Sequence, residues 1–490
     1  MIPVATAAQV RELDRRVIED LGLPGVALME VAARGVAKAI VRHHAEDARR
    51  GTVVVCGGGN NGGDGYAVAR WLDQLGFPVS IWSLDDQSKG DAAIMREAAR
   101  RLQIPEVEKL GEAWLIVDAL FGTGLDRPVT GHKAAAIVAM NEHPAPVVAV
   151  DVPSGLHSDT GAVLGVAVEA AHTVVLGRHK AGLFCGAGPD LTGHLTLVDI
   201  GLDALATYAD ASAELPEAVD LAPLWPVRAR GDHKNRSGHL LVVAGSANMA
   251  GAAILTCRGA LGAGVGLVTL VVPRNATPRL QGLAPEVMLL VHGDGDVLPD
   301  VPADALRGRT AVAAGPGLGG GAPLTASLAT SLRALWAGPL PAVFDADALV
   351  AATGPSTAPR VITPHPGEAS RLLSIETDAV QADRFAAVAR LAGDHTALLK
   401  GRYTLVASAS RRVSINPRNS PVLGSGGSGD VLTGVIGALL ARGVAAHDAA
   451  RLGSWVHGRA GERLEARRSG GWTAADVAHE LPDAIAELAP

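Results

Sequence analysis

The chain has 490 residues, of which 48% are hydrophobic and 19% charged, so it can bury large cores and is not intrinsically disordered. This length favours at least two domains. The net charge of -7, with basic residues scattered along the chain, argues against a nucleic acid as partner. Three isolated cysteines without a CxxC pair are typical of the cytoplasm, where we expect the protein, and argue against a thiolate metal site. The uncharged stretch 237–257 is interrupted by polar residues, so we expect no membrane segment.

The first half of the chain alternates strands and helices. Two N-terminal helices are separated at Pro24-Gly25, and Thr6 with Gln9 forms a capping box for the first of them. Short apolar strands then alternate with amphipathic helices, which indicates a parallel sheet covered on both faces, a Rossmann-like doubly wound sheet. The strands are predicted at 52–56, 79–82, 114–118, 147–151, 173–176 and 195–199, and the helices between them begin near Asp64, Asp91 and Gly131.

A change in composition separates the two halves. Residues 204–226 are rich in alanine, proline and acidic residues and show weak periodicity, which is typical of a linker. We therefore expect one domain over residues 1–210 and another over residues 220–490. The second half is again α/β, with a helix at 251–263. Its strands are predicted at 238–245, 267–272, 311–314, 342–345, 361–363, 396–399 and 403–407.

Three loops that follow predicted strands of the first half carry polar side chains. The loop at 56–65 contains a GxGxxG pattern and also Asn60 and Asn61, which supply amide oxygens. The loops at 118–124 and 151–155 add carboxylates and a hydroxyl. Because ligands bind beyond the carboxyl ends of parallel strands, we expect the three loops to converge. Amide, carboxylate and hydroxyl oxygens suit a hard cation and not zinc.

A glycine-rich loop in the second half precedes a predicted helix. Residues 424–430 read Gly-Ser-Gly-Gly-Ser-Gly-Asp, and the helix is expected to open at Asp430. Backbone N–H groups of such a loop, with the positive end of the helix, hold a phosphate. A carboxylate within an anion site is suited to take a proton from a hydroxyl that meets a phosphoryl group. The alternative is that Asp430 only caps the helix.

Four further loops of the second half lie at strand ends. Residues 248–253 begin a helix with small side chains, and the glycines of 315–319 allow close approach of a ligand. The two prolines of 363–368 hold His365 and Glu368 rigidly. The basic turn 400–404 is either a hairpin turn or a nucleotide contact.

The first half resembles the NAD(P)H-hydrate epimerase family through its three polar loops. The resemblance implies that Asp151 acts as acid or base at the reacting ring, and that Asn61, Asp118 and Ser154 hold potassium as cofactor. Arg127 is in addition a candidate partner of a phosphate group. The implied binding site for hydrated NADH or NADPH consists of Asn60, Asn61, Gly62, Gly63, Asp64, Gly122, Thr123, Gly124, Leu125, Asp126, Arg127, Pro128 and Asp151.

The second half resembles the ADP/ATP-dependent NAD(P)H-hydrate dehydratases of the ribokinase-like superfamily over residues 225–490. The resemblance implies a ribokinase-like α/β domain that uses ADP or ATP with Mg²⁺. It places Ala253, Gly317, His365 and Asp430 around the hydrated nucleotide. The implied contacts to the adenine nucleotide are Lys400, Gly401, Arg402, Tyr403, Thr404 and Gly429. Ser420-Pro421 stands where the family usually has Asn-Pro, which affects a minor nucleotide contact.

Together the two resemblances imply repair of nicotinamide nucleotides. One domain would epimerise the R and S hydrates of NADH or NADPH, and the other would dehydrate the S epimer at the expense of ADP or ATP. Asp430 would be the base that lets the ring hydroxyl be phosphorylated, after which loss of phosphate restores the double bond. We expect a homo-oligomer, with a tetramer as the candidate assembly.

Three other functions compete with this interpretation. A kinase for a vitamin or sugar alcohol would account for the second half but would leave the loop with Asn60 and Asn61 without a role. A nucleotide sensor or scaffold would have no use for the carboxylates of Asp151 and Asp430. A dehydrogenase is the weakest alternative, because no acidic residue follows the second strand before Asp85.

Overall fold

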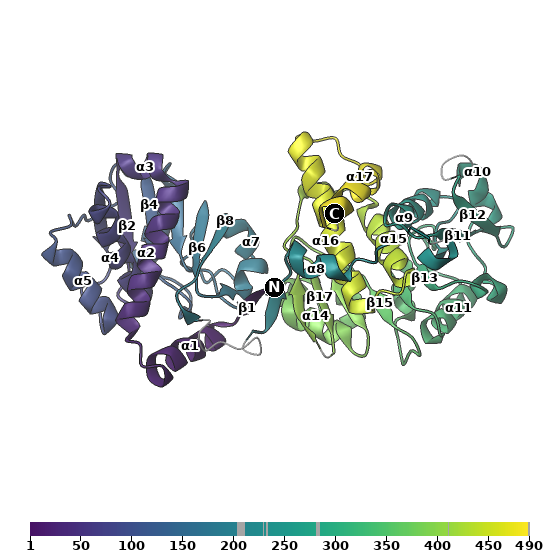
Figure 1. Cartoon of the computed structure of the whole chain (residues 1–490), viewed down its shortest axis with the longest axis horizontal. Coiled ribbons are helices and arrows are strands. Elements are labelled where there is room, and N and C mark those ends of the chain that lie inside the picture. Colours follow the sequence, from purple (N-terminus) through teal and green to yellow (C-terminus); the bar gives the residue numbers. More distant parts are fainter. Residues whose placement is uncertain (203–210, 229, 232–233, 281–284, 410, 489–490) are drawn as a thin grey trace. The chain divides into compact units, whose positions relative to one another are not determined.

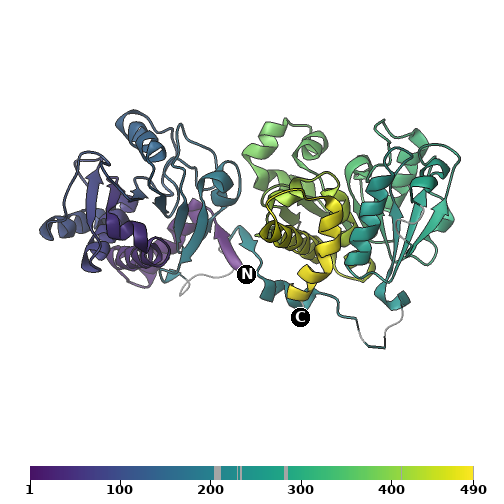
Figure 2. The same cartoon turned by 90° about the horizontal axis from the view of Figure 1, so that it is seen from above.

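The structure, a computed structural model, describes residues 1–202, 211–228, 230–231, 234–280, 285–409 and 411–488. It divides into two compact units, one formed by residues 3–213 and the other by residues 214–490 together with Met1 and Ile2 (Figures 1 and 2). Of the expected linker, residues 204–210 lie outside the described residues. Of the helices that the structure describes, none is long and apolar enough to cross a membrane. Both units are α/β, which confirms the predicted fold class.

The N-terminal unit contains a parallel six-stranded sheet in the order β3-β2-β4-β5-β6-β8. The chain passes from β2 to β3 on one side and then returns to β4 on the other side of β2. This reversal creates a switch point between β2 and β4, where ligands bind in open α/β sheets. The strands are β2 (Thr52–Cys56), β3 (Val79–Ser83), β4 (Leu115–Ala119), β5 (Val147–Val150), β6 (His172–Leu176) and β8 (His194–Val198).

Helices cover both faces of this sheet (Figure 1). Successive strand residues point to opposite faces. Val54 and Cys56 pack with α2 (Gly25–His43), α4 (Asn60–Gln74) and α5 (Asp91–Arg101). Val53 and Val55 pack with α6 (Gly131–Glu142) on the other face. The unit is therefore the doubly wound sheet that the sequence predicts. Its shorter helices are α3 (Ala45–Arg50) and α7 (Gly188–Leu191).

The first helix, α1 (Ala7–Arg15), follows a short strand that the sequence did not predict. Thr6 and Gln9 form the predicted capping box at its start. Leu13 packs with Leu28 of α2, and the chain continues as a π-helical turn at Arg16–Asp20. The preceding strand β1 (Ile2–Ala5) pairs in parallel with β7 (His179–Lys180), so that Ala5 lies opposite Lys180. This pairing fixes the start of α1 beside Lys180.

The helix after β2 begins earlier than predicted. α4 starts at Asn60 and not near Asp64, so the Asn-Asn-Gly-Gly-Asp sequence forms its first turn. Glycine-rich sequence favours a loop, but here the glycine is needed for close packing. A methyl group on Gly62 would collide with the carbonyl oxygen of Gly57.

The C-terminal unit contains the strand order β12-β11-β10-β13-β14-β15-β16-β17-β18. The strands from β12 to β16 are parallel to their neighbours, whereas β17 and β18 are antiparallel additions at one end. The sequence did not predict β12, whose residues are all partly exposed, or the charged β18. The strands are β9 (Ala213–Leu215, at the unit boundary), β10 (His239–Val243), β11 (Leu267–Val272), β12 (Val287–Val291), β13 (Ala311–Ala314), β14 (Ala342–Phe344), β15 (Arg360–Ile362), β16 (Thr396–Leu399), β17 (Leu405–Ser408) and β18 (Arg411–Ile415).

Four helices form a large core with one face of this sheet. α15 is buried along nearly its whole length and packs against α9. A methyl group on Gly434 would collide with the carbonyl oxygen of Thr256, so the two helices approach closely at this glycine. The four helices are α9 (Ala250–Gly262), α15 (Ser428–Ala441), α16 (Ala446–Arg467) and α17 (Ala474–Leu488). Other helices of the unit are α8 (Ala218–Leu221), α10 (Thr277–Leu280), α11 (Ala326–Ala337), α12 (Pro366–Leu373), α13 (Thr377–Ala382) and α14 (Arg384–Ala392).

The start of α15 corrects one expectation. The helix begins at Ser428 with Gly427 as N-cap, at φ 90°, where glycine is favoured. Asp430 is therefore in the first turn and does not cap the helix, in contrast to the alternative weighed above.

Candidate functional site

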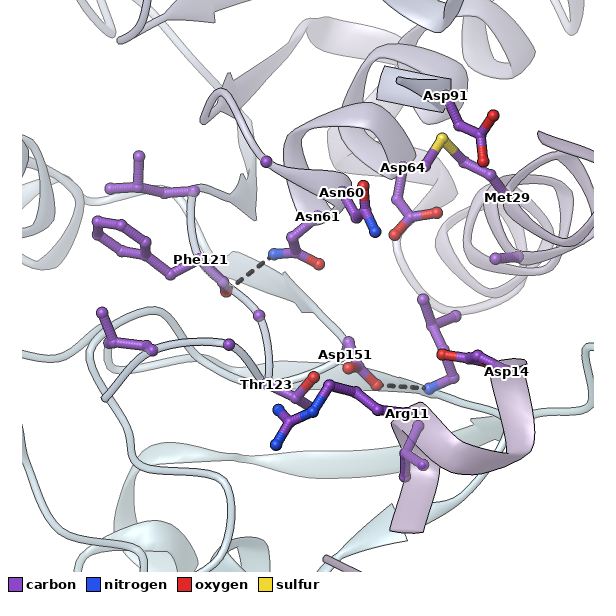
Figure 3. A pocket seen from close by; sticks show the side chains of 18 of the residues that line it. Arg11, Asp14, Met29, Asn60, Asn61, Asp64, Asp91, Phe121, Thr123 and Asp151 are labelled. Carbon is purple, nitrogen blue, oxygen red and sulfur yellow. Dashed lines mark hydrogen bonds between the residues drawn. The ribbon is translucent and has the colours of Figure 1, made fainter. Parts of the chain in front are cut away.

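A cavity of about 890 Å³ lies at the carboxyl ends of the strands of the N-terminal unit (Figure 3). It is bordered by the loop and first turn after β2, by the loop after β4 and by Asp151 after β5. The three loops that were expected to converge therefore contribute to one region. The predicted residues that line it are Asn60, Asn61, Asp64, Gly122, Thr123, Gly124, Leu125, Asp126, Arg127 and Asp151.

Three residues of the implied substrate site do not line this cavity. Gly62 and Gly63 are buried in the first turn of α4, where side chains would collide with Gly57 and Met29. Pro128 is exposed beyond the end of the lining loop. These residues shape the loops, because glycine lets α4 approach the strand end and proline restricts the backbone.

Asp118 is fully buried at the end of β4 and is bound by Ser154. The Ser154 N–H donates to Asp118 Oδ2 at 2.8 Å, and the Ser154 hydroxyl donates to Oδ1 at 2.6 Å. Burial raises the pKa of Asp118 to about 6, although hydrogen bonds from Ser154 and Leu120 oppose the rise. Among the described residues, no cationic side chain contributes to this shift. A cation at this point would compensate the buried charge.

Asn61 adds to the same group of oxygen atoms. Its Nδ2 donates to the Phe121 carbonyl at 2.9 Å, which turns the amide oxygen toward the cavity (Figure 3). The Phe121 N–H in turn donates to the Ser154 hydroxyl at 2.8 Å. Asn61, Asp118 and Ser154 are thus joined through one loop. Amide, carboxylate, hydroxyl and carbonyl oxygens are ligands for a hard cation, and this donor set fits potassium. Within the described residues, no three His, Cys, Asp or Glu side chains are arranged to hold a metal ion.

Asp151 forms an ion pair with Lys180, a residue that sequence reasoning missed. Asp151 follows β5 with φ 71°, an unfavourable conformation for a residue with a side chain. It is held there because its Oδ1 accepts hydrogen bonds from the Leu176 N–H at 3.0 Å and from Lys180 Nζ. Lys180 is fully buried and also donates to the Leu176 carbonyl at 2.8 Å.

Two further carboxylates lie near this ion pair. Burial, followed by the charges of Asp151 and Asp14, raises the pKa of Asp64 well above its usual value, against the influence of Lys180. Burial and the nearby Asp151 raise the pKa of Asp14 to about 6, again opposed by Lys180. Asp14 and Lys180 both line the cavity and were not predicted. The signal for Asp14 was a carboxylate within the apolar stripe Val10, Leu13 and Val17 of the first helix.

The C-terminal unit has its own cavity of about 690 Å³, between the β16–β17 turn and the start of α15. Five of the six predicted nucleotide contacts line it, namely Lys400, Gly401, Arg402, Thr404 and Gly429, whereas Tyr403 does not. Ser420 lines it as well, and its hydroxyl accepts a hydrogen bond from the Val422 N–H at 3.3 Å. Sequence reasoning missed Asn416, Arg418, Asn419, Ser428 and His457, which also line this cavity.

Lys400 is the centre of a charged network beside this cavity. Its Nζ donates to Asp345 Oδ1 at 2.8 Å and lies 3.8 Å from Glu368 Oε2. The Thr433 hydroxyl donates to Asp345 Oδ2 at 2.7 Å, which links α15 to the end of β14. Burial alone would lower the pKa of Lys400, but Asp345, Glu368 and Asp430 together raise it. The lysine therefore remains charged near the glycine-rich loop. Asp345 was not predicted as a site residue, although it is the last residue of a predicted strand.

Asp430 lies in the first turn of α15, next to this network. Burial raises its pKa to about 7, the nearby Asp345 adds to the rise, and Lys400 opposes it. A carboxylate with a pKa near neutrality is suited to accept and release a proton. Gly429 precedes it, and a methyl group there would lie 3.4 Å from Lys400 Nζ. The helix start, Lys400 and Asp430 thus lie together, although Asp430 itself does not line the cavity.

Three more residues were predicted to contact the hydrated nucleotide: Gly317 and His365 lie beyond the ends of strands, and Ala253 lies in α9. Gly317 follows β13 at φ 68°, and a methyl group there would lie 3.0 Å from Ala252, next to the buried Ala253 of α9. His365 follows β15 and caps α12, because its Nδ1 accepts a hydrogen bond from the Gly367 N–H at 3.0 Å. The His365 N–H donates to Glu368 Oε2 at 2.8 Å, which connects His365 to Lys400. None of the three residues lines the cavity beside Lys400.

Comparison with known proteins shows two families in one chain. The family model of NAD(P)H-hydrate dehydratase matches residues 240–483, and that of the YjeF-related protein N-terminus matches residues 25–182. A bifunctional NAD(P)H-hydrate repair enzyme from Moorella thermoacetica is 37% identical over 95% of this chain and 93% of its own length. The enzyme of the same name from Escherichia coli is 36% identical over 94% of this chain and 89% of its own length.

A solved structure is similar to the second half of this chain. The ADP/ATP-dependent NAD(P)H-hydrate dehydratase from Bacillus subtilis, co-crystallised with ATP and Mg²⁺, is 27% identical and covers 56% of this chain and 97% of its own. The TM-score is 0.50. The resemblance to both families is thereby confirmed, and the chain belongs to the family of bifunctional NAD(P)H-hydrate repair enzymes.

Proposed function

We propose that this chain restores NADH and NADPH from their hydrates through two activities. The N-terminal unit interconverts the R and S epimers of the hydrate. The C-terminal unit dehydrates the S epimer to NAD(P)H at the expense of ADP or ATP. The observation that carries the proposal is the position of Asp430, a carboxylate with its pKa raised to about 7, at a glycine-rich helix start beside Lys400.

Dehydration has a chemical obstacle, because hydroxide is a poor leaving group. Asp430 takes the proton of the ring hydroxyl, and the oxygen attacks the terminal phosphoryl group of the nucleotide. The N–H groups of the first turn of α15 and the charge of Lys400 stabilise the negative charge that develops on phosphate. The nitrogen lone pair then expels the phosphate from the ring carbon, and loss of a proton from the adjacent carbon restores the double bond. Asp345 keeps Lys400 in place through its 2.8 Å hydrogen bond.

We expect Mg²⁺ to bind together with the nucleotide. This cation is usually bound by substrate phosphates with one or two carboxylates. The carboxylate of Asp345, which accepts a hydrogen bond from Thr433 of α15, is an oxygen donor of this kind, so the residues present fit the ion. Bound Mg²⁺ would neutralise charge on the phosphates.

Epimerisation takes place at the cavity of the N-terminal unit. Asp151, held by Lys180 and by the Leu176 N–H, is the acid–base group at the ring. Asn61, Asp118 and Ser154 would hold potassium, and the ion would fix the loops after β2, β4 and β5 around the substrate. The buried Asp118 carboxylate supports this assignment. Among the described residues, no cationic side chain contributes to the shift of its pKa.

The two activities can be separated in one assay. A single purified epimer is incubated with the full chain without nucleotide, and the epimers are resolved by chromatography. We expect a mixture of both epimers and no gain of reduced nicotinamide absorbance. Addition of ADP or ATP with Mg²⁺ should then restore the absorbance. A stable phosphorylated product in place of NADH would instead indicate a kinase.

A further inference from the structure

An epimerase breaks a bond on one face of a carbon and forms it again on the other. This needs an acid and a base close to the same atom. In the hydrate the hydroxyl is on a carbon bonded to the ring nitrogen, so the nitrogen lone pair can expel the oxygen once it is protonated. Asp151 supplies one of the two groups, and the function proposed above leaves the second group unassigned.

Asp14 reaches the same cavity from a different element. It lies on α1, whose start is fixed beside Lys180 because β1 pairs with β7. Asp14, Asp151 and Lys180 all line the cavity, and Figure 3 shows both carboxylates at its edge. Asp151 is placed by the sheet and Asp14 by a helix, so a ring between these elements can be approached by two carboxylates.

The other carboxylates of this helical segment have a different charged partner from that of Asp14. Glu19 and Asp20 are exposed, Glu12 is partly exposed, and all three pair with Arg15. Asp14 instead interacts with Lys180 and Asp151, on the side of α1 that faces the cavity. Its position thus differs from that of a solvated surface charge.

The charges around Lys180 imply that its three neighbouring carboxylates are not all ionised at the same time. Asp14 from α1, Asp64 from α4 and Asp151 after β5 surround this one lysine. A single positive charge does not balance three ionised carboxylates in a buried site. Burial and the charges of Asp151 and Asp14 raise the pKa of Asp64 well above its usual value. Asp14, whose pKa is about 6, is the group that exchanges a proton near neutral pH.

We propose that Asp14 is the second acid–base residue of epimerisation, acting together with Asp151; this inference rests on the proposed epimerase function. For one epimer, Asp14 donates its proton to the ring hydroxyl, the C–O bond breaks and the nitrogen lone pair forms a C=N bond. The water released adds to the opposite face of the carbon, and Asp151 takes a proton from it. The roles of Asp14 and Asp151 are reversed for the other epimer, so no further reactant is consumed.

The test uses the full chain with Asp14→Asn, which keeps the size of the side chain but removes the titrating group. Epimerisation of a purified epimer is measured without nucleotide, after subtraction of the rate in buffer. Dehydration of the S epimer by the same preparation reports the concentration of folded enzyme. Asp20→Asn, an exposed carboxylate close by in sequence, is the matched control and should leave epimerisation unchanged.

We expect Asp14→Asn to lower kcat of epimerisation by about 100-fold or more with a small change in KM. For the epimer that Asp14 protonates, the wild-type rate should fall as pH rises above about 6, and the variant should lose this dependence. Asp14→Glu should restore part of the rate. The inference is overturned if Asp14→Asn keeps a rate within a few-fold of wild type, if only KM changes, or if the pH profile keeps its shape. Absence of epimerisation by the wild type would instead contradict the proposed function itself.

Discussion

Lys400 Nζ lies 2.8 Å from Asp345 Oδ1, and this contact holds the lysine at the start of α15, next to Asp430. Both residues follow parallel strands, β14 and β16, that end at the same edge of the sheet. The pair therefore connects the sheet to the glycine-rich helix start. It also sets the charge of the site, because Asp345 raises the pKa of Asp430 and Lys400 lowers it.

Asp430→Asn should abolish most dehydration. The substitution preserves the size of the side chain but removes the base, so we expect a loss on the order of 10²–10⁴-fold. Affinity for ADP should be maintained or increased, since a negative charge beside the phosphates is removed. Rates of dehydration and binding of ADP are measured on the same preparation, with epimerisation as the control for folding. A dehydration rate within a few-fold of wild type would remove Asp430 from the mechanism.

The same substitution should stabilise the protein at alkaline pH. The pKa of Asp430 is raised from 3.8 to about 7 in the folded state, so stability is lost as pH rises through this range. Each pKa unit corresponds to about 1.4 kcal/mol, which gives an upper value of about 4 kcal/mol above pH 7. Asp430→Asn should therefore have a higher Tm than wild type at pH 8 and an equal Tm below pH 4. An equal Tm at both pH values would show that Asp430 is not destabilised by its surroundings.

Dehydration should depend on the ionisation of Asp430. The base must be deprotonated, so kcat should rise with pH up to a plateau above about pH 7. Asp345→Asn removes the neighbouring negative charge and should move this rise to lower pH. The measurement is the pH profile of kcat for both proteins, with nucleotide at saturation. A rise at the same pH in both would contradict the coupling of the two carboxylates.

Potassium should be required for epimerisation and not for folding. Ser154→Ala removes the hydroxyl that bonds to Asp118 at 2.6 Å, so the variant should need more potassium for the same rate. Epimerisation is titrated with potassium in a sodium buffer for both proteins. A chelator of divalent cations is the control, since it should stop dehydration, which uses Mg²⁺, and leave epimerisation unchanged. Equal rates with and without potassium would rule out the proposed ion site.

Much of the fold follows from local sequence. The buried strands 52–56, 267–272, 311–314 and 396–399 were predicted with the bounds that the structure gives, because each is a continuous apolar run. β12 was missed because a partly exposed edge strand lacks this signal, and β18 because it begins with two arginines. The start of α4 was placed too late because its glycines indicate a loop, whereas here they serve close packing.

The candidate sites were accessible to sequence reasoning only in part. Residues within glycine-rich or polar loops, such as Asn61 and Asp430, stand out locally. Lys180 and Asp14 do not, since their roles depend on the pairing of β1 with β7 and on the ion pair with Asp151. Asp345 ends a predicted strand, but its connection to Lys400 and Thr433 is made only by the folded sheet. Contacts between distant segments were therefore the part that sequence could not provide.

The central claim is that one chain repairs both hydrate epimers, and recovery of reduced nicotinamide absorbance from an equal mixture of epimers tests it most directly. With ADP or ATP and Mg²⁺ present, wild type should restore the whole absorbance. Asp151→Asn should rapidly restore only the fraction that began as the S epimer, and Asp430→Asn should restore almost none. Recovery by wild type that stops at the S fraction, or the same complete recovery with Asp151→Asn, would contradict the account.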